Sequence, residues 1–373
     1  MIEMNKRVHL LIDKSRIVDY SLLPLKFNKN SLYGRGYNLS FFFKPTKKCL
    51  TCDILILFSK PVLEMLNEKM AIIEEPSPTL DLLIKARKYS NKVIWMDTSD
   101  STSVTHFELL PFIDLYLKKQ LFKDKTLYKK NFYGGRIFTQ FYHDKFSIID
   151  SNPFNQFFTL EDKYFDKVNI SWNIGLGDMY SAFSKNKLIP SLISKLMSRY
   201  YVKYTLPLQS KSKDLFLKTS TNLERELIGF HRKELIKRLD EIIIKNKLVG
   251  IIQGKMLSTK KLREAMADSK IIPSPFGWGE IGVRDYEAFI NGSVLLKPDI
   301  SHLSTWPEIF IENKTYQPFK WDFSNLEEVI INLLEDEKQR INIANNGQNY
   351  YKDSISKDGM SRFCDWFINQ IEK

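Results

Sequence analysis

The sequence has little cysteine and no long apolar run. Three cysteines occur in 373 residues, which is typical of a reducing compartment and excludes a disulfide scaffold. Cys49 and Cys52 form a C-x-x-C pair, but no second pair completes a zinc site. No apolar run approaches the ~18 residues of a membrane span, and the N-terminal residues lack the pattern of a signal peptide. We therefore expect a cytoplasmic protein, one that can still lie peripherally at the inner membrane.

Sequence motifs for common cofactors are also absent. Neither a G-x-G-x-x-G nor a Walker-type glycine loop occurs, which counts against dinucleotide and ATP chemistry. The run from Asp97 to Asp100 does not have D-x-D spacing, and no other cluster has the spacing of metal ligands. We expect no cofactor and no obligatory metal ion.

Acidic residues are scarce in two stretches, and the whole chain carries a formal net charge of +12 at pH 7. No acid lies between Met179 and Lys213, and residues 116–136 interleave lysines with aromatic side chains. A positive field of this kind attracts phosphate esters, anionic lipid headgroups or nucleic acid. A lysine-rich face that is simply solvated is the alternative interpretation.

Short apolar runs alternate with segments of helical period along the chain. Residues 7–13, 53–58 and 92–97 predict strands, with a helix predicted over 78–91. The pattern restarts at residues 214–218, after the basic middle. Strands that alternate with helices indicate parallel βαβ units. We therefore predict an α/β protein of two doubly wound, Rossmann-like domains that face a cleft.

The predicted domain division has three parts. Residues 1–205 form an N-terminal domain with the basic linker region, and residues 206–355 form a C-terminal domain. Residues 356–373 form a terminal helix that packs back on the N-terminal domain. A further helix is predicted over residues 326–351, stopping near Gly347, because glycine commonly follows the end of a helix.

The most informative stretch is PSPFGWGEIGVRDYEAFINGSVLLKPDISHLSTWP, residues 273–307. Its loop and helix follow a predicted parallel strand, at the edge where open α/β sheets bind ligands. Gly279 and its neighbouring glycines let backbone approach a ligand or offer amides to phosphate. Arg284 can pair with a phosphate or carboxylate, and Glu287 can accept two hydrogen bonds from a ribose diol.

The run GEIGVRDYEAFINGSVLLKPD resembles the donor-binding segment of GT-B glycosyltransferases. In that superfamily the second glutamate of a Glu-to-Glu motif holds the ribose of the sugar nucleotide, and Glu287, followed by alanine, matches it. The usual position of the first glutamate is Gly279 here, and Glu280 lies one residue closer. The resemblance makes Gly279, Glu280, Arg284, Glu287 and His302 the expected donor-binding residues of the C-terminal domain.

A more specific resemblance is to uncharacterised glycosyltransferases of bacterial surface-polysaccharide gene clusters. It rests on the strings PFGWGE, RDYEA, LLKPDISHLSTWP and FKWDFSNLEEVI and, more loosely, on DTSDST, LPFIDLYLKKQLFKD and YGGRIFTQFYH. It implies metal-independent transfer of a sugar from a nucleotide-sugar donor to a growing lipopolysaccharide, O-antigen or capsule glycan. The C-terminal domain would bind the donor and the N-terminal domain the acceptor.

The predicted glycosyltransferase function suggests a role for the basic stretches. The acceptors of such enzymes are glycans or lipid-linked glycans, so we expect an anionic membrane surface as a partner. The lysines and aromatic side chains of residues 116–136 are predicted to hold the protein on that surface.

Sugar transfer also requires cations for the leaving phosphate. The candidates are Lys218, at the end of a predicted strand, and Arg225, which would share a helix face with Arg232 seven residues later. Arg35, in the glycine loop YGRGYN, is a weaker candidate for meeting donor or acceptor charge.

A general base is expected from the N-terminal domain, across the cleft. Asp97 and Asp100 lie where the strand predicted over 92–97 ends, and His106 is close behind. Glu74 and Glu75 form a second candidate pair. An aspartate at the end of a strand is also a common helix cap, which is the structural alternative for Asp97 and Asp100.

Two other functions fit parts of the sequence. A protein that binds nucleic acid or another polyanion would explain the basic charge, but no recognised nucleic-acid motif is present and lysine far outnumbers arginine in the basic stretches. We therefore expect no nucleic-acid partner. A catalytically inactive, nucleotide-sugar-binding subunit would explain the displaced first glutamate at Glu280.

Overall fold

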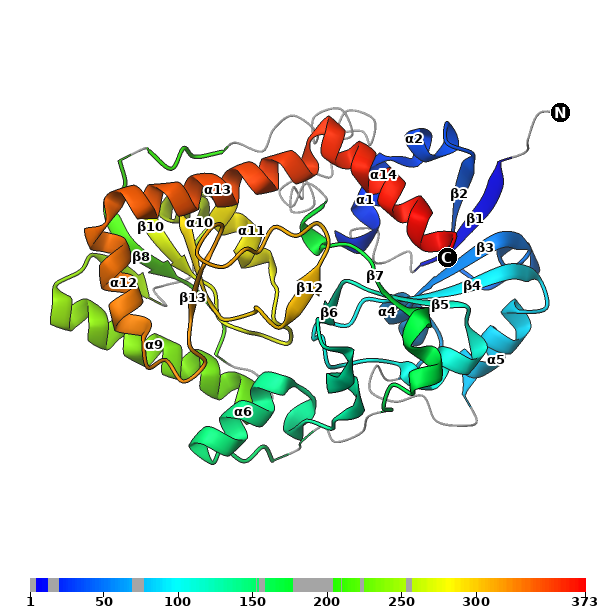
Figure 1. Cartoon of the computed structure of the whole chain (residues 1–373), viewed down its shortest axis with the longest axis horizontal. Coiled ribbons are helices and arrows are strands. Elements are labelled where there is room, and N and C mark those ends of the chain that lie inside the picture. The colour runs from blue at the N-terminus through cyan, green and yellow to red at the C-terminus, as the bar shows by residue number, and fades with distance from the viewer. Residues whose placement is uncertain are drawn as a thin grey trace.

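The computed structural model describes residues 5–12, 20–68, 77–151, 153, 158–176, 204–208, 210–221, 225–252 and 257–373. Strands and helices alternate along these residues and build two α/β domains that lie side by side (Figure 1). No helix within the described ranges is long and apolar enough to cross a membrane.

The N-terminal domain is built on a parallel six-stranded sheet in the order β2-β1-β3-β4-β5-β7. Its central strands are continuous apolar runs, as expected for parallel strands covered on both faces. The strand order reverses between β1 and β3, which is where doubly wound sheets open a crevice for ligands. The strands are β1 (Lys6–Leu11), β2 (Tyr37–Phe42), β3 (Cys52–Phe58), β4 (Ser90–Asp97), β5 (Leu115–Lys118) and β7 (Val168–Ile170).

Successive residues of each strand belong to opposite faces of this sheet. On β3, Leu55 and Leu57 belong to the larger core cluster, which also contains buried leucines of α5. Ile54 and Ile56 belong to a second cluster, which contains the C-terminal helix. The helices of this half of the chain are α1 (Leu23–Phe27), α2 (Lys29–Tyr33), α3 (Lys47–Leu50), α4 (Ser59–Met65), α5 (Pro78–Ala86) and α6 (Ile137–Phe146).

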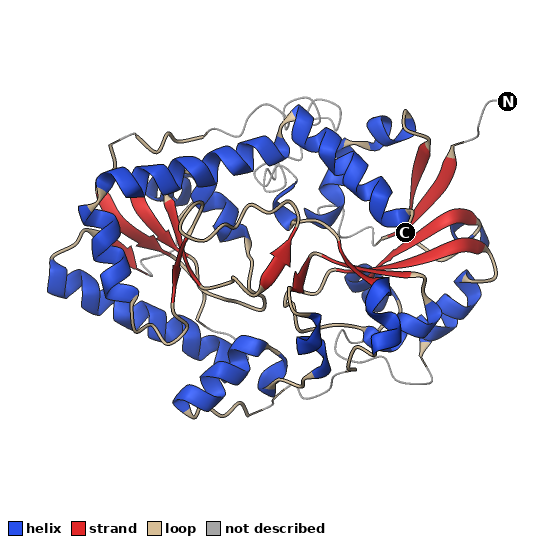
Figure 2. Cartoon of the chain, viewed as in Figure 1, coloured by secondary structure: helices blue, strands red, loops and turns tan. Residues whose placement is uncertain are grey.

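The C-terminal domain repeats this design with a parallel five-stranded sheet in the order β13-β11-β10-β8-β9. Its order reverses between β8 and β10, and helices flank it (Figure 2). The elements are β8 (Lys213–Leu217), α9 (Glu226–Asn246), β9 (Gly250–Ile252), α10 (Thr259–Ala267), β10 (Ser269–Pro273), α11 (Val283–Ile290), β11 (Val294–Pro298), β13 (Gln317–Phe319), α12 (Leu326–Glu335) and α13 (Glu337–Ile355).

The helix predicted over 326–351 is wrong in its continuity and in its end. Asp336 separates α12 from α13 and caps α13 by accepting a hydrogen bond from the backbone of Gln339. Gly347 lies inside α13. Close packing requires a glycine there, because a β-carbon would come within 2.7 Å of the Phe289 ring and of the Thr315 carbonyl oxygen. This glycine serves close packing and does not end the helix.

The last helix, α14 (Lys357–Ile371), crosses from the C-terminal domain back to the N-terminal sheet (Figure 1). Phe363 and Phe367 are buried in the second core cluster, with ring centroids 5.4 and 5.9 Å from that of Trp172. The indole of Trp366 stacks on Trp306 at 4.7 Å. The C-terminal helix therefore forms part of the core beneath the first sheet.

A two-stranded antiparallel sheet also connects the domains. In it β6 (Gln120–Phe122) pairs with β12 (Leu303–Thr305). Two Rossmann-like domains facing a cleft confirm the predicted GT-B-like fold class. All strands of the first sheet precede residue 171, and those of the second begin at residue 213. The exact domain boundaries after residues 205 and 355 stay predictions.

Candidate functional site

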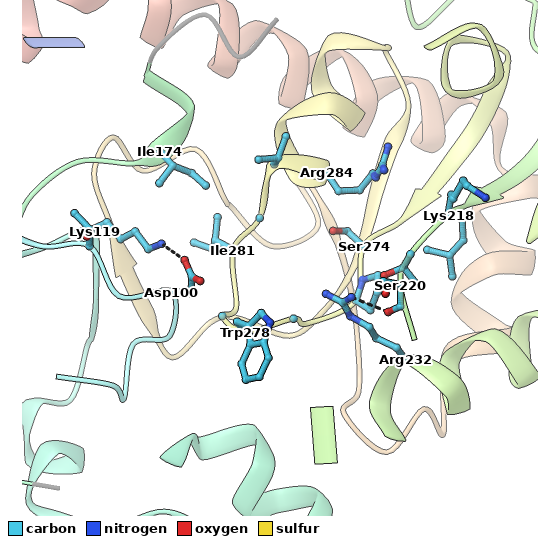
Figure 3. A pocket seen from close by; sticks show the side chains of 18 of the residues that line it. Asp100, Lys119, Ile174, Lys218, Ser220, Arg232, Ser274, Trp278, Ile281 and Arg284 are labelled. Carbon is cyan, nitrogen blue, oxygen red and sulfur yellow. Dashed lines mark hydrogen bonds and ion pairs between the residues drawn. The ribbon is translucent and has the colours of Figure 1, made fainter. Parts of the chain in front are cut away.

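A cavity of about 750 Å³ lies between the domains, beyond the carboxyl ends of strands from both sheets. On the C-terminal side it begins where β8 and β10 end, which is the point where that sheet reverses its order. Figure 3 shows side chains from both domains converging on this space. The lining includes Ser21, Lys60, Thr98, Asp100, Lys119, Ile174, Lys218, Thr219, Ser220, Arg232, Ser274, Trp278, Gly279, Ile281, Gly282 and Arg284.

The cations of the C-terminal wall come from three separate elements. Lys218 directly follows β8, Arg232 comes from α9, and Arg284 lies in the first turn of α11. The carbonyl oxygens of Phe276 and Ser220 accept hydrogen bonds from Arg232 at 2.9 and 2.8 Å and fix its guanidinium beside the loop. Burial lowers the pKa of Arg232. These cations meet only after folding, since 66 residues separate Lys218 from Arg284.

Arg225 does not share the position of Arg232. It is the residue before the first turn of α9, with extended backbone angles, so the helical spacing of seven does not apply. Its Nε lies 3.2 Å from the Asp150 carboxylate, outside the cavity lining. The expectation that Arg225 and Arg232 lie on one helix face is therefore wrong.

Glycines allow the loop between β10 and α11 to pack closely. A β-carbon at Gly277 would lie 2.4 Å from the guanidinium of Arg232, and one at Gly279 would lie 1.9 Å from the carbonyl oxygen of Asp100. At Gly282, the residue before α11, no atom lies within 4 Å of where a β-carbon would stand. The amino end of α11 therefore faces open space in the cavity, and helix amino ends favour anions.

A buried ion pair anchors α11 beneath the cavity. The Lys297 ammonium lies 3.0 Å from Asp285, and both side chains are buried. Ser274, which lines the cavity, donates a hydrogen bond to the same carboxylate. Sequence analysis missed this pair, although a lysine in the buried run VLLKP was a visible signal.

Glu287 lies one turn behind Arg284 and does not line the cavity. Its Oε2 is 2.9 Å from Nη1 of Arg284, and it is 9% exposed. Burial raises the pKa of Glu287, and the Arg284 guanidinium opposes that shift. The ion pair orients Arg284 from below, so the two predicted residues meet and only the arginine reaches the cavity.

The N-terminal wall carries Asp100 together with two lysines that sequence analysis missed. Nζ of Lys119 lies 3.2 Å from the Asp100 carboxylate (Figure 3). Lys60, at the start of α4, lines the same wall. Burial opposes the charge of Asp100, but the attraction of Lys119 and Lys60 is stronger, so its pKa lies below the usual value. Asp100 is therefore ionised and faces the cavity.

Asp97 and His106, the other proposed bases, lie outside the cavity lining. Asp97 is fully buried, 2.7 Å from the Lys118 ammonium, and accepts a hydrogen bond from Tyr116. Burial would raise its pKa, but Lys118 and His106 hold that pKa well below the usual range. His106 is also fully buried, with Nδ1 3.4 Å from Glu108. Both residues occupy the interior between β4 and β5.

Glu280 and His302 lie at the junction of the domains and do not line the cavity. The Glu280 carboxylate accepts hydrogen bonds from residues of the N-terminal domain only. The His302 ring lies between Phe122 and Trp321, with centroids 6.0 and 5.3 Å away, and burial lowers its pKa. Neither side chain reaches the cavity at which the donor is expected.

Several other predictions have clear outcomes. Arg35 pairs with Asp365 and donates a hydrogen bond to Ser361, both on α14, and it does not line the cavity. Four aromatic side chains of residues 116–136 cannot enter a membrane, because Tyr116, Phe122, Tyr128 and Phe132 are buried in the core. The expectation that these aromatic side chains hold the protein on a membrane is therefore wrong. Glu74, Glu75 and residues 179–203 of the acid-free stretch lie outside the described residues.

The charges of the cavity favour an anionic ligand. Among the described lining residues, five are cationic, namely Lys60, Lys119, Lys218, Arg232 and Arg284, against the single carboxylate of Asp100. Two arginines can present parallel N–H groups to phosphate oxygens. The cavity volume lies within the range of small-molecule sites. The arrangement can therefore bind a diphosphate on one wall and place a hydroxyl group near Asp100 on the other.

Comparisons with known proteins gave solved structures only. No family model matches the chain, and no curated protein matches it. An α-glucosyltransferase in complex with UDP and a 13-mer DNA is similar at 11% identity and a TM-score of 0.49, over 99% of this chain and 100% of the other. HepE of Anabaena in complex with UDP is similar at 12% identity and a TM-score of 0.43, over 99% of this chain and 100% of the other. An α1,3-fucosyltransferase is similar at 11% identity and a TM-score of 0.44, over 100% of this chain and 91% of the other.

Proposed function

We propose that the protein is a glycosyltransferase that moves a sugar from a nucleotide-sugar donor to an acceptor hydroxyl. The observation that carries the proposal is the cationic cavity between two Rossmann-like domains, located where the C-terminal sheet reverses its strand order. A nucleoside diphosphate carries the negative charge that this wall would neutralise. The sequence resemblance of residues 279–299 to GT-B donor segments supports the same assignment.

The donor would bind to the C-terminal wall. Lys218, Arg232 and Arg284 line it and would contact the diphosphate, with the amino end of α11 adding oriented amides. These groups stabilise the charge that develops on the leaving phosphate, which is a large term in catalysis. In this proposal the side chains supply that charge without a resident metal ion. Glu287 would hold the ribose diol if donor binding drew it away from Arg284.

Asp100 would act on the acceptor. In an inverting reaction the acceptor oxygen forms a bond to the anomeric carbon while the bond from that carbon to the phosphate oxygen breaks. The electron pair of that bond leaves with the nucleoside diphosphate, and the hydroxyl proton passes to Asp100. A carboxylate that stays ionised beside Lys119 and Lys60 is available for this role.

The nucleotide site can be tested by calorimetry with uridine, guanosine and cytidine diphosphates. We expect one class to bind the wild type and Arg284→Gln to weaken that binding by about 10- to 100-fold, or ~1.4–3 kcal/mol, because a charged hydrogen-bond donor is lost. Arg238→Gln is the matched control, since Arg238 belongs to α9 but pairs with Glu234 outside the cavity. A flat panel would refute the proposal. Binding without turnover would instead indicate a nucleotide-sugar-binding subunit.

We further propose that the acceptor is a growing bacterial surface glycan and that the protein works at an anionic membrane surface. The resemblance to surface-polysaccharide transferases supports the acceptor. For the membrane, Lys44, Lys47, Lys48, Lys85 and Lys88 are exposed, and none has a carboxylate partner among the described residues. Phe43, Ile84 and Tyr89 are exposed among them, and Lys47 lies over the Tyr89 ring at 5.6 Å.

Vesicle flotation tests this surface. We expect binding to vesicles that contain phosphatidylglycerol and little binding to pure phosphatidylcholine. Glutamine at positions 47, 48, 85 and 88 should abolish the difference. Glutamine at Lys237, Lys245 and Lys260 is the control, because these exposed lysines already pair with acids. Flotation that ignores the anionic lipid would remove the membrane from the proposal and leave the nucleotide site untouched.

A further inference from the structure

Glu280 occupies an unusual position for a residue of a donor loop. It belongs to the C-terminal domain, between β10 and α11, yet its side chain is buried within the N-terminal domain and only 1% of the residue is exposed. Its carboxylate accepts hydrogen bonds from Ser101 Oγ at 3.0 Å, from the Thr102 backbone at 3.0 Å and from Gln120 Nε2 at 2.7 Å. All three donors lie on the opposite domain.

The residues around Glu280 strengthen this junction. Nε of Arg136 donates to the carbonyl oxygen of Trp278 at 2.8 Å, and its guanidinium lies 5.5 Å from the indole centroid. Gly279 packs so closely on Asp100 that a β-carbon would overlap the Asp100 carbonyl oxygen. The loop is therefore fastened to the N-terminal domain at Gly279 and Glu280, and at Trp278 to Arg136, which precedes α6, a helix packed against α9.

The same contacts reach Asp100. Ser101 and Thr102, which Glu280 holds, follow Asp100 directly in the chain. Gln120, the third donor, also donates to the Asp100 carbonyl oxygen at 3.2 Å. A shift of Glu280 would therefore break the hydrogen bonds that fix the backbone next to Asp100. It would also move Trp278, which lines the cavity two residues before Glu280.

Removing or displacing a buried, hydrogen-bonded carboxylate costs free energy. Without Glu280, the Ser101 hydroxyl and the Thr102 backbone N–H would lose their buried acceptor, and Gln120 would keep only its bonds to the neutral oxygens of Asp100 and Thr102. Hydrogen bonds to a charged acceptor are stronger than those between neutral groups. The junction therefore favours the closed arrangement of the domains.

We propose that Glu280 is a positioning residue that latches the donor loop into the N-terminal domain and keeps the cavity assembled before any ligand binds. Its carboxylate is committed to that latch, so Asp100 is the carboxylate that meets the ligand. The latch itself is independent of the reaction, whereas its effect on catalysis through Asp100 rests on the proposed function.

Small-angle scattering of the full chain tests the latch without any substrate. We expect the radius of gyration of the wild type to stay constant when a nucleoside diphosphate is added. Glu280→Ala and Gln120→Ala should each raise it, since they remove opposite partners of one contact. Asp114→Asn is the control, because Asp114 bonds Val93 and Arg87 within one domain. A wild type that contracts on adding nucleotide, or alanine variants as compact as the wild type, would overturn the proposal.

Binding and turnover separate positioning from a direct ligand contact. If Glu280 positions, Glu280→Ala raises the apparent Kd of the nucleotide only by the reciprocal of the closed fraction. It lowers kcat more than it raises KM, and Glu280→Gln, which keeps one acceptor oxygen, partly restores both compactness and kcat. Lost nucleotide binding at unchanged compactness would make Glu280 a ligand residue and overturn the latch. If no nucleotide binds even the wild type, the proposed function fails while the scattering result still decides the latch.

Discussion

At the scale of single residues, His231 shows how one buried ring supports the cavity wall. The backbone N–H of Phe276 can only donate, so Nε2 of His231 accepts that bond at 3.2 Å. The proton therefore stands on Nδ1, which donates to the hydroxyl oxygen of Tyr142. Burial lowers the pKa of His231 to about 3. A neutral imidazole thus ties α9 to the loop that carries Trp278.

This histidine predicts a loss of stability in acid. Its pKa is about 3 when folded and ~6.5 when unfolded, so between these values the unfolded chain binds the extra proton. Stability is full above pH ~6.5 and falls as the pH decreases, by up to ~1.4 kcal/mol per pH unit. Urea unfolding at pH 7 and pH 5 should show a drop in the wild type that is larger, by about 2 kcal/mol, than in His231→Gln. Equal drops in the two proteins would contradict this assignment.

At the scale of elements, α11 and β11 depend on a charge pair placed where apolar side chains are usual. Lys297 and Asp285 are both buried and lie 3.0 Å apart. This pair joins the strand to the first turn of the helix and holds Ser274 at the cavity. The amino end of α11 is therefore fixed in direction before a ligand arrives.

Removing one partner of this pair should be costly. We expect Lys297→Met to destabilise the fold by about 3–5 kcal/mol, because the Asp285 charge is left buried alone. The double variant with Asp285→Leu should recover most of that loss, which chemical unfolding can measure. A single variant that is as stable as the wild type would show that the pair contributes no stability.

At the scale of the whole molecule, α14 joins the two domains by completing the core of the first one. Met360, Phe363, Cys364, Phe367 and Ile371 are buried in the cluster beneath the N-terminal sheet. The N-terminal domain therefore depends on the last residues of the chain for its core.

We expect Phe367→Ala to destabilise the N-terminal domain by about 3–5 kcal/mol, through lost apolar burial and the cavity that remains. Hydrogen exchange should show the loss in β1, β3 and β4, and much less in β10 and β11. Ile368→Ala is the comparison on the same helix, since Ile368 is only partly buried. Uniform loss of protection across both sheets would mean that the domains unfold as one unit.

The chain order of strands and helices was predictable because apolar periodicity is a local property. The runs at 53–58 and 92–97 became β3 and β4, and the loop after β10 reached the cavity as expected. The roles of individual charged residues were much less predictable. Asp97 ends β4 and Asp100 lies three residues later, yet Asp97 is buried against Lys118 and Asp100 faces the cavity.

The sequence by itself determined two α/β domains, the parallel strands and a ligand loop after β10, since short-range hydrophobic patterns encode these features. Only the tertiary structure decided which charges share the cavity. Lys60 and Lys119 join Arg232 there, and Glu280 leaves it to bond Gln120, 160 residues away in the chain. Such assignments depend on packing between distant segments, and no local pattern carries that information.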